Sequence, residues 1–290
     1  MNTRFAVLVL FISSAGWGLT WMPIKALSNL GLDGMHLVFI AFFSGALLTL
    51  PWLFSQRRFW SRKISLMLMI ACTGGFANAS FQSAIYHGDV IRVMILFYML
   101  PVWSVIGGRL FLHEKVDAIR MFAVLLSLSG AFVILDVAHT SWAGVTAIDL
   151  LAIGSGIGLA ATNILFRFTQ DIPVMSKGSA MFIGCSVLIG LSLMVFTASG
   201  GLPDNSAALW AVAYGALWLT LITTGTQWGV TQLEAGRSAV IIVVELVVAV
   251  ASSALILTGE LTVFELCGGL MVLGAALLEG ARDNLRPRAR

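Results

Sequence analysis

Glu245 is an ionisable residue that lies far from any predicted loop. It lies inside the apolar run from Ile241 to Val248, with no basic residue within a helical turn or two. A charged side chain at bilayer depth costs about 2.5 to 3.5 kcal/mol, so we expect Glu245 to face a bundle interior or a wet cavity. Desolvation favours the neutral acid. Such a carboxyl group suits a proton-coupling residue or the counter-ion of a substrate amine; the alternative is a protonated Glu hydrogen-bonded to a neighbouring helix.

Uncharged polar residues within apolar segments form a second set of candidates. Asn78 and Gln82 are four residues apart and share a helix face, as do Thr223 and Gln227, and Asn163 stands by itself. Each could hydrogen-bond a substrate amide or carboxylate. Each could equally join two helices at about 0.6 kcal/mol per bond. We predict all five as substrate-binding residues and keep the structural alternative open.

Aromatic residues in the same segments could line a cavity or stack on a cationic ligand. The candidates are Trp17, Trp21, Tyr98 and Trp228, with helix packing as the alternative for each. Pro101 removes a backbone hydrogen bond in mid-helix and frees a carbonyl group, so we predict a hinge there.

Signatures of catalysis and metal binding are missing from the sequence. It contains no GxxxxGK[ST] loop, no HExxH and no GxSxG. Its three cysteines lie in apolar runs without CxxC or Cys/His ligand spacing, and its four histidines are scattered. We therefore expect no enzyme, no metal site and no cofactor.

Composition identifies the kind of protein that must position these residues. The 290-residue chain is 59% hydrophobic and 11% charged, with a formal net charge of +3. Soluble globular proteins carry about 25% charged residues, so a soluble enzyme, a disordered chain and a nucleic-acid partner are all disfavoured. The composition predicts an all-α integral membrane protein, whose partners are membrane lipid and a small-molecule substrate.

Apolar runs of about 20 residues mark membrane-crossing helices. Ten such spans are predicted, with short loops between them. They cover residues 5–24, 35–54, 64–86, 91–111, 118–136, 147–166, 178–198, 208–230, 238–258 and 262–280. With a cytoplasmic N-terminus, all basic residues except Lys25 and Arg92 fall on the cytoplasmic side. The pattern predicts a multi-pass protein of the inner (plasma) membrane with both termini cytoplasmic.

An internal duplication is indicated by like residues 145 positions apart. The pairs are Gln82 and Gln227, Asp89 and Glu234, and Arg92 and Arg237. The sequence thus divides into a five-helix half at 1–140 and another at 141–290 that ends in a basic cytoplasmic tail. Because five is odd, the second half is inverted, an arrangement that places a substrate site near the midplane between the halves. We predict ten transmembrane helices in two inverted five-helix repeats.

Three further features occur in order along the chain. Trp17-Gly18 lies in the first span, and Leu100-Pro101-Val102 lies in the fourth. An acidic residue precedes a glycine-rich span at 114–130 and again at 260–274. In this order the chain resembles the EamA-domain branch of the drug/metabolite transporter (DMT) superfamily. The resemblance implies that the first four helices of each half surround a central cavity, while the fifth and tenth pack peripherally and mediate a homodimer. It also implies export, less often import, of amino acids, amines and other small metabolites.

Together these features favour a secondary active transporter, in the first instance an exporter of small metabolites such as amino acids or amines. It would work by alternating access, with proton coupling through Glu245. An uncoupled facilitator or importer is one alternative. A non-transporting membrane scaffold or sensor subunit is another.

Overall fold

The computed structural model describes residues 3–32, 34–140, 144–196, 205–257 and 261–285. Within these ranges the chain is helical, as the composition predicts, and no strand occurs. The first part of the chain contains α1 (Thr3–Gly18), α2 (Trp21–Asn29), α3 (Gly34–Ser55), α4 (Arg57–Trp60), η1 (Ser61–Lys63), α5 (Ile64–His87), α6 (Val90–Phe97), α7 (Leu100–Phe111), α8 (Ala118–Ile134) and η2 (Val137–His139). The second contains α9 (Ala147–Phe168), α10 (Val174–Phe196), α11 (Asn205–Ala213), the π-helix η3 (Tyr214–Leu219), α12 (Thr220–Gln232), α13 (Ala235–Ile242), α14 (Val244–Ile256) and α15 (Val263–Leu285). Glu260, which precedes the last predicted span, lies outside the described residues.

The membrane-crossing helices follow the predicted spans. In the described part of the chain, nine helices or helix pairs are long and apolar enough to cross a membrane. The fifth predicted span is the shorter apolar helix α8, whose 17 residues extend about 26 Å at 1.5 Å per residue. The all-α, multi-span membrane fold is therefore confirmed.

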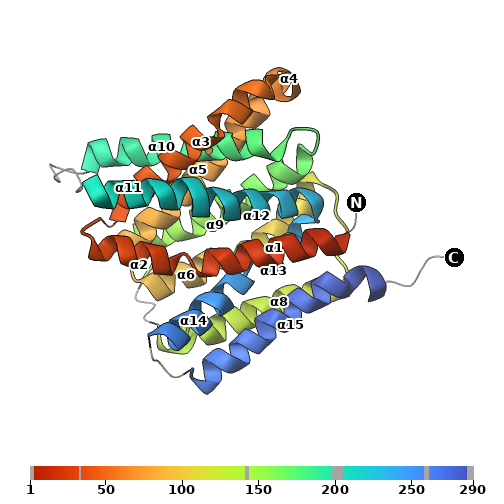
Figure 1. Ribbon diagram of the computed structural model, residues 1–290. Helices are drawn as coiled ribbons and strands as arrows, with labels where there is room; N and C mark the ends of the chain where they lie inside the picture. Colours follow the sequence, from red (N-terminus) through yellow and green to blue (C-terminus); the bar gives the residue numbers. More distant parts are fainter. Residues whose placement is uncertain (1–2, 33, 141–143, 197–204, 258–260, 286–290) are drawn as a thin grey trace.

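Helix packing relates the two parts of the chain. α5 packs against α9 as α1 packs against α12, and α6 and α7 pack against α9 as α13 and α14 pack against α1. α3 pairs with α10, and α8 pairs with α15 at the edge of the bundle (Figure 1). An internal two-fold relation would produce these pairs. The division at residue 140 stays a prediction.

Glycine permits the close pairing of α8 with α15. A Cβ at Gly130 would lie 2.7 Å from the carbonyl oxygen of Gly268, and a Cβ at Gly268 would lie 2.6 Å from that of Gly130. Small residues at such crossings let helix backbones approach each other within a membrane. The peripheral position of these two helices follows the arrangement that the family resemblance implies.

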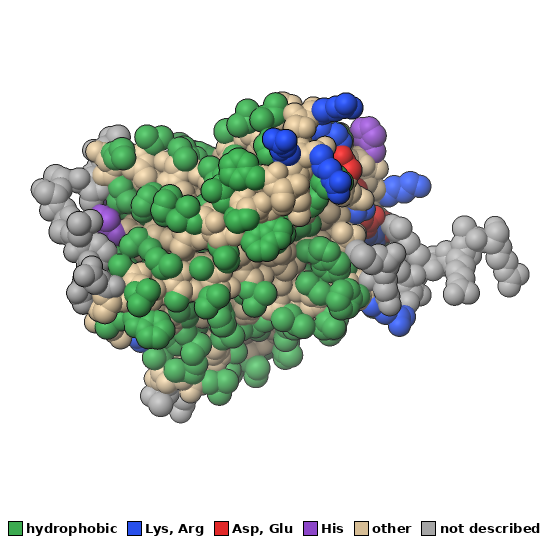
Figure 2. Space-filling model, turned by 45° about the horizontal axis from the view of Figure 1, so that its top comes forward, with side chains coloured by type: hydrophobic (Ala, Val, Ile, Leu, Met, Phe, Trp, Pro, Cys, Tyr) green, Lys and Arg blue, Asp and Glu red, His purple; other side chains and the backbone are tan. Residues whose placement is uncertain are grey.

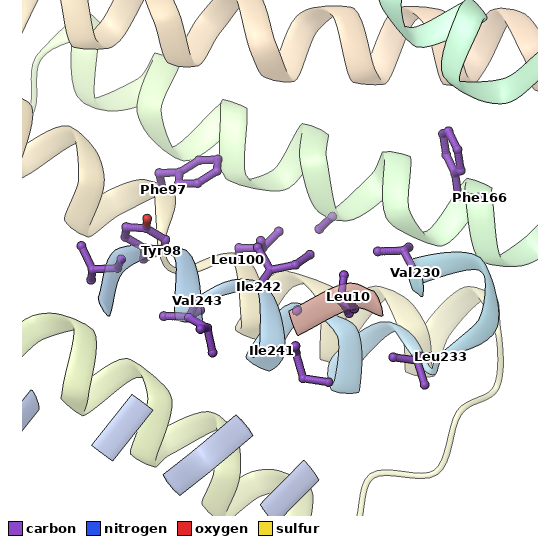
Figure 3. Close-up of a cluster of buried hydrophobic side chains, with 14 of the residues drawn as sticks. Leu10, Phe97, Tyr98, Leu100, Phe166, Val230, Leu233, Ile241, Ile242 and Val243 are labelled. Atoms are coloured by element: carbon purple, nitrogen blue, oxygen red, sulfur yellow. The ribbon is translucent and has the colours of Figure 1, made fainter. Parts of the chain in front are cut away.

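Two predicted spans are interrupted near their centres. The fourth changes from α6 to α7 at Tyr98 and Met99, and Pro101 lies in the first turn of α7, where a missing N–H costs little. The ninth changes from α13 to α14 at Val243. Side chains beside both breaks belong to one apolar cluster, in which Figure 3 shows Phe97, Tyr98 and Leu100 with Ile242 and Val243. The two breaks therefore share a packed core.

Charged side chains gather at one end of the bundle. Figure 2 shows Lys, Arg and acidic groups concentrated there, while hydrophobic side chains cover the visible flank. α1 begins and α15 ends at this end (Figure 1). We call it the charged end and define it by Glu114, Asp117, Arg120, Glu234 and Arg282. The opposite end is defined by the ion pair between Arg92 and Asp149.

Candidate functional site

A cavity of about 110 Å³ lies among the helices at the middle of their length. Its wall is built by α1, α5, α6, α9, α10, α12, α13 and α14, so helices from both parts of the chain contribute. Seven of the ten predicted substrate-binding residues line it: Trp17, Asn78, Gln82, Asn163, Thr223, Gln227 and Glu245. The structure thus brings together residues up to 228 positions apart.

Glu245 occupies the first turn of α14, directly after the break in the ninth span. Its Oε1 accepts a hydrogen bond of 3.2 Å from the Tyr98 hydroxyl group, which lies at the break in the fourth span. Among the residues that the structure describes, no basic side chain forms an ion pair with Glu245. The carboxyl group is therefore held by a neutral donor and faces a cavity.

Several polar atoms of the cavity wall have no partner among the described residues. They are Nδ2 and Oδ1 of Asn163, Oγ1 of Thr223, Oγ1 of Thr226 and Oε1 of Gln227. All four side chains are buried. A buried polar group without a hydrogen bond costs about 1 to 3 kcal/mol, and such groups are rare in native structures. Their concentration on one cavity indicates a place where a polar solute or water supplies the missing bonds.

Other polar groups of the wall are engaged within the protein. Asn78 donates from Nδ2 to the carbonyl group of Gly74, at 2.8 Å, and Gln227 donates from Nε2 to the sulfur of Met181, at 4.0 Å. The Asn78 amide is thus partly used by its own helix. Asn163 is a fully enclosed amide of the wall whose two polar atoms both lack a partner among the described residues.

Three predicted substrate-binding residues do not line the cavity. Tyr98 reaches it indirectly, through its hydrogen bond to Glu245. Trp21 donates from Nε1 to the Ser252 hydroxyl group, at 2.9 Å, and Trp228 packs edge-on against Phe5, with ring centroids 5.6 Å apart. The structure therefore gives Trp21 and Trp228 contacts that join helices.

The cavity is more accessible from the opposite end than from the charged end. Asn163 and Gln227 lie near the last residues of α9 and α12, which end at the charged end, and both are buried. Gln82 lies near the last residue of α5, which ends at the opposite end, and it is partly exposed, as are Trp17 and Glu245. A solute would meet the partly exposed side first.

Buried Lys177 lies one helical turn from Met181 of the cavity wall, toward the charged end. Its Nζ donates to the carbonyl groups of Phe166, at 2.8 Å, and Thr169, at 3.0 Å, and lies 3.3 Å from the Thr231 hydroxyl group. These bonds join α10 to the last turns of α9 and α12. Lys177 thus joins the C-terminal turns of these helices on the charged-end side of the cavity.

An ionic network lies farther out, at the charged end itself. Arg120 and Arg282 are each 1% exposed, and both contact Glu234 at the start of α13 and the fully buried Glu279 of α15. Arg282 also contacts Asp117, at 2.6 Å. Nη1 of Arg120 lies 3.7 Å from Oε2 of Glu114. The Glu114 carboxylate also accepts hydrogen bonds from the backbone N–H of Ala235. The network connects α8, α13 and α15.

Comparison with known proteins finds a family resemblance in the first part of the chain. The model of the EamA-like transporter family matches residues 4–136. Over these residues the chain is similar to EamA-domain membrane proteins. A solved crystal structure of a protein superposes on it with a TM-score of 0.76 at 14% sequence identity, and the match covers 97% of this chain and 99% of the other. Comparison with curated proteins finds no match. The matched family is one of membrane transporters, which supports a transporter in general.

The match with the EamA-like family ends before most of the polar cavity wall. Trp17, Asn78 and Gln82 fall within the matched residues, whereas Asn163, Gln227 and the other unpaired groups come from α9 and α12. The second part of the chain therefore supplies the unpaired polar groups and Glu245.

Sequence analysis missed several residues of the wall. Thr226 follows Thr223 by three residues and therefore shares its helix face, so extending the periodicity would have found it. Phe81 and Phe97 also line the cavity, with ring centroids 4.5 Å apart. Both aromatic residues lie in ordinary apolar runs, and nothing in their local sequence distinguishes them from core residues.

Proposed function

We propose that this protein is a secondary active transporter that exports small metabolites, such as amino acids or amines, by alternating access. The observation that carries the proposal is the mid-depth cavity, which unpaired amide and hydroxyl groups line together with a carboxyl group. Substrate would contact Trp17, Asn78, Gln82, Asn163, Thr223, Gln227 and Glu245. A site at this depth can be reached from each side in turn.

Movement between the two states would use the broken spans. Pro101 begins α7 directly after the break in the fourth span, and Gly156 of α9 approaches the Phe97 carbonyl group so closely that a Cβ would lie 3.0 Å from it. We propose Pro101 as part of the hinge. Because Pro101 has no backbone N–H, one hydrogen bond fewer joins α6 to α7, which would make a change of their angle easier.

Glu245 would couple transport to protons. Binding of a proton and binding of a cationic group compete for one carboxylate, so a proton entering from outside would release substrate there, and substrate entering from inside would displace the proton. This exchange amounts to proton–substrate antiport. Tyr98 supports it, because its hydroxyl group donates to the carboxylate.

Proteoliposomes containing a pH-sensitive dye test the coupling. We expect a pool of small amines and amino acids to move protons through the native protein and through Glu265→Gln, a control on the exposed first turn of α15. Glu245→Gln should abolish the movement. If Glu245→Gln responded to the imposed pH gradient like the native protein, Glu245 would not be the coupling residue. Solute uptake without proton movement in the native protein would indicate an uncoupled facilitator.

We also propose an inner-membrane location with both termini cytoplasmic, which the distribution of basic residues supports. A reporter enzyme that is active only outside the membrane, fused after the last residue, should stay inactive.

A homodimer through α8 and α15 completes the proposal, supported by exposed apolar side chains such as Phe122 and Leu270. Cross-linking of Phe122→Cys in membranes should then yield a dimer, and its absence would count against this interface.

A further inference from the structure

The charge of the cavity limits which metabolites it can hold. Among its described lining residues, Glu245 is acidic and none is basic. A cationic ligand therefore neutralises the site when Glu245 is ionised. A zwitterionic amino acid would add a carboxylate that has no cation to pair with, and burying an unpaired charge is costly.

The unpaired groups of the cavity wall define a second requirement. Asn163 offers both a donor and an acceptor, the Thr223 and Thr226 hydroxyl groups can do either, and Gln227 offers a free acceptor. A hydroxyl or carboxamide group can both donate and accept, so it can satisfy this mixed wall. A carboxylate accepts only, so it could pair with Asn163 Nδ2 and the hydroxyl groups but would leave the Gln227 and Asn163 oxygen atoms without a donor.

The size of the cavity sets a third limit. An apolar cavity of about 150 Å³ holds one benzene molecule, and the cavity here measures about 110 Å³. It can therefore enclose a solute of about four to six non-hydrogen atoms. The rings of Trp17, Phe81 and Phe97 line the remaining surface. They can contact methylene groups and the face of an ammonium group.

We infer that the cavity selects a compact monocation that carries one neutral hydrogen-bonding group, a hydroxyl or a carboxamide. The ammonium group binds Glu245, and the neutral group binds Asn163 and Gln227. This inference rests on the proposed function and narrows it, because it excludes amino acids with a free carboxylate from the substrates.

Two matched pairs of probes separate the requirements, with thermal stabilisation of the purified protein at pH 6.5 as the measurement. Glycinamide and glycine have the same number of non-hydrogen atoms and differ in the carboxylate; 2-aminoethanol and propylamine differ in the hydroxyl group. The α-amino group is mainly cationic at this pH, because its ordinary pKa is about 8. We expect glycinamide and 2-aminoethanol to stabilise the native protein with at least tenfold lower dissociation constants than their partners.

Variants assign each preference to a wall. Glu245→Gln should remove the preference for glycinamide over glycine, and Asn163→Leu should remove the preference for 2-aminoethanol over propylamine. Glu265→Gln should keep both preferences. Each variant is first shown to have a cooperative thermal transition without ligand. If Asn163→Leu fails to fold, Asn163→Asp serves as the second variant of this wall. Asn163→Asp should strengthen the binding of all cations.

Equal or stronger binding of glycine, or binding of neither favoured probe, would overturn the inference. Proton movement with amino acids in the proteoliposome pool would then leave the proposed transport function standing. A pool that moves no solute and no protons would instead remove the proposed function itself.

Discussion

The two ends of the bundle close in different ways. At the charged end, Arg120 and Arg282 share Glu234 and Glu279 within a network of several buried charges. At the opposite end, the ion pair between Arg92 and Asp149, at 2.6 Å, combines with helix caps. Removing one partner from a buried ionic group leaves the others uncompensated. The charged end should therefore resist opening more than the opposite end.

The accessibility of the cavity follows the same difference. Asn163 and Gln227, toward the charged end, are buried, and Lys177 lies beyond them. Gln82, toward the opposite end, is partly exposed. The cavity wall is therefore more exposed toward the opposite end, and the proposed alternating access would require the ionic network to separate.

Arg120→Met should produce the largest loss of stability. It would leave the buried Glu279 carboxylate with Arg282 alone and remove contacts of Glu234 and Glu114, so we expect a loss of about 3 kcal/mol. Unfolding of the purified protein with increasing concentrations of a denaturing detergent would measure this loss of stability. Arg109→Met, at an exposed position near the same end, is the control and should change little. Equal stability of the two variants would mean that the network does not hold the charged end.

Asp149→Ala should have the next largest effect, about 2 kcal/mol, because it removes both an ion pair and a helix cap. Asp149 accepts from Arg92 and from the backbone N–H of Thr146. Asp149→Asn retains an acceptor for the cap and should lose less. The same unfolding assay compares them. A loss larger than that of Arg120→Met would reverse the ranking of the two ends.

Glu114 should make the charged end sensitive to pH. Burial raises the pKa of this carboxyl group above its ordinary value of 4.5, despite the hydrogen bond from Ala235. Because the folded-state pKa is the higher one, protonation of Glu114 stabilises the folded protein. This stabilisation is fully present below pH 4.5 and is lost as the pH rises through the folded-state pKa. Thermal midpoints of native protein and Glu114→Gln between pH 4 and 8 would test this. The native protein should lose stability relative to the variant as pH rises, and a constant difference would contradict the prediction.

Asp171→Asn should have the smallest effect, because the ion pair that it breaks is exposed. The side chains of Lys63 and Asp171 are 43% and 56% exposed, at 2.5 Å from each other. Exposed pairs contribute about 0.2 to 1 kcal/mol. The hydrogen bond from Lys63 holds the pKa of Asp171 below its ordinary value of 3.8, so the contribution is present above that pH and is lost as the pH falls through the folded-state value. Unfolding at pH 7 in low and high salt would measure it; a loss above that of Asp149→Ala would show that surface charge also holds this end.

Much of the fold was predictable because membrane spans are local features. A helix within the bilayer needs a continuous apolar run, and each predicted span corresponds to a helix or helix pair. The break after Phe97 was foreshadowed by Pro101, since proline acts through its own backbone. The break at Val243 was not, because that segment contains neither proline nor glycine. There the helix changes direction within a run of branched side chains that favours no break.

The candidate cavity was predictable only in part. Glu245, Asn163 and Gln227 were found because polar groups are conspicuous in apolar runs, and the structure places all three on one cavity. Trp21 and Trp228 satisfied the same criterion of an aromatic residue within a span, yet they pack elsewhere. Composition identifies a residue inside a span and leaves open the direction in which its side chain points.

The sequence by itself determined the number and length of the membrane-crossing helices and the residues that could carry chemistry, because hydrophobicity and residue type are properties of the local chain. Tertiary structure alone decided which faces meet. It paired Arg120 with Glu234, set Tyr98 against Glu245, and left Asn163 without a side-chain partner among the described residues. These outcomes depend on how each helix is rotated and packed against its neighbours, and that rotation is fixed by contacts between residues far apart in the chain.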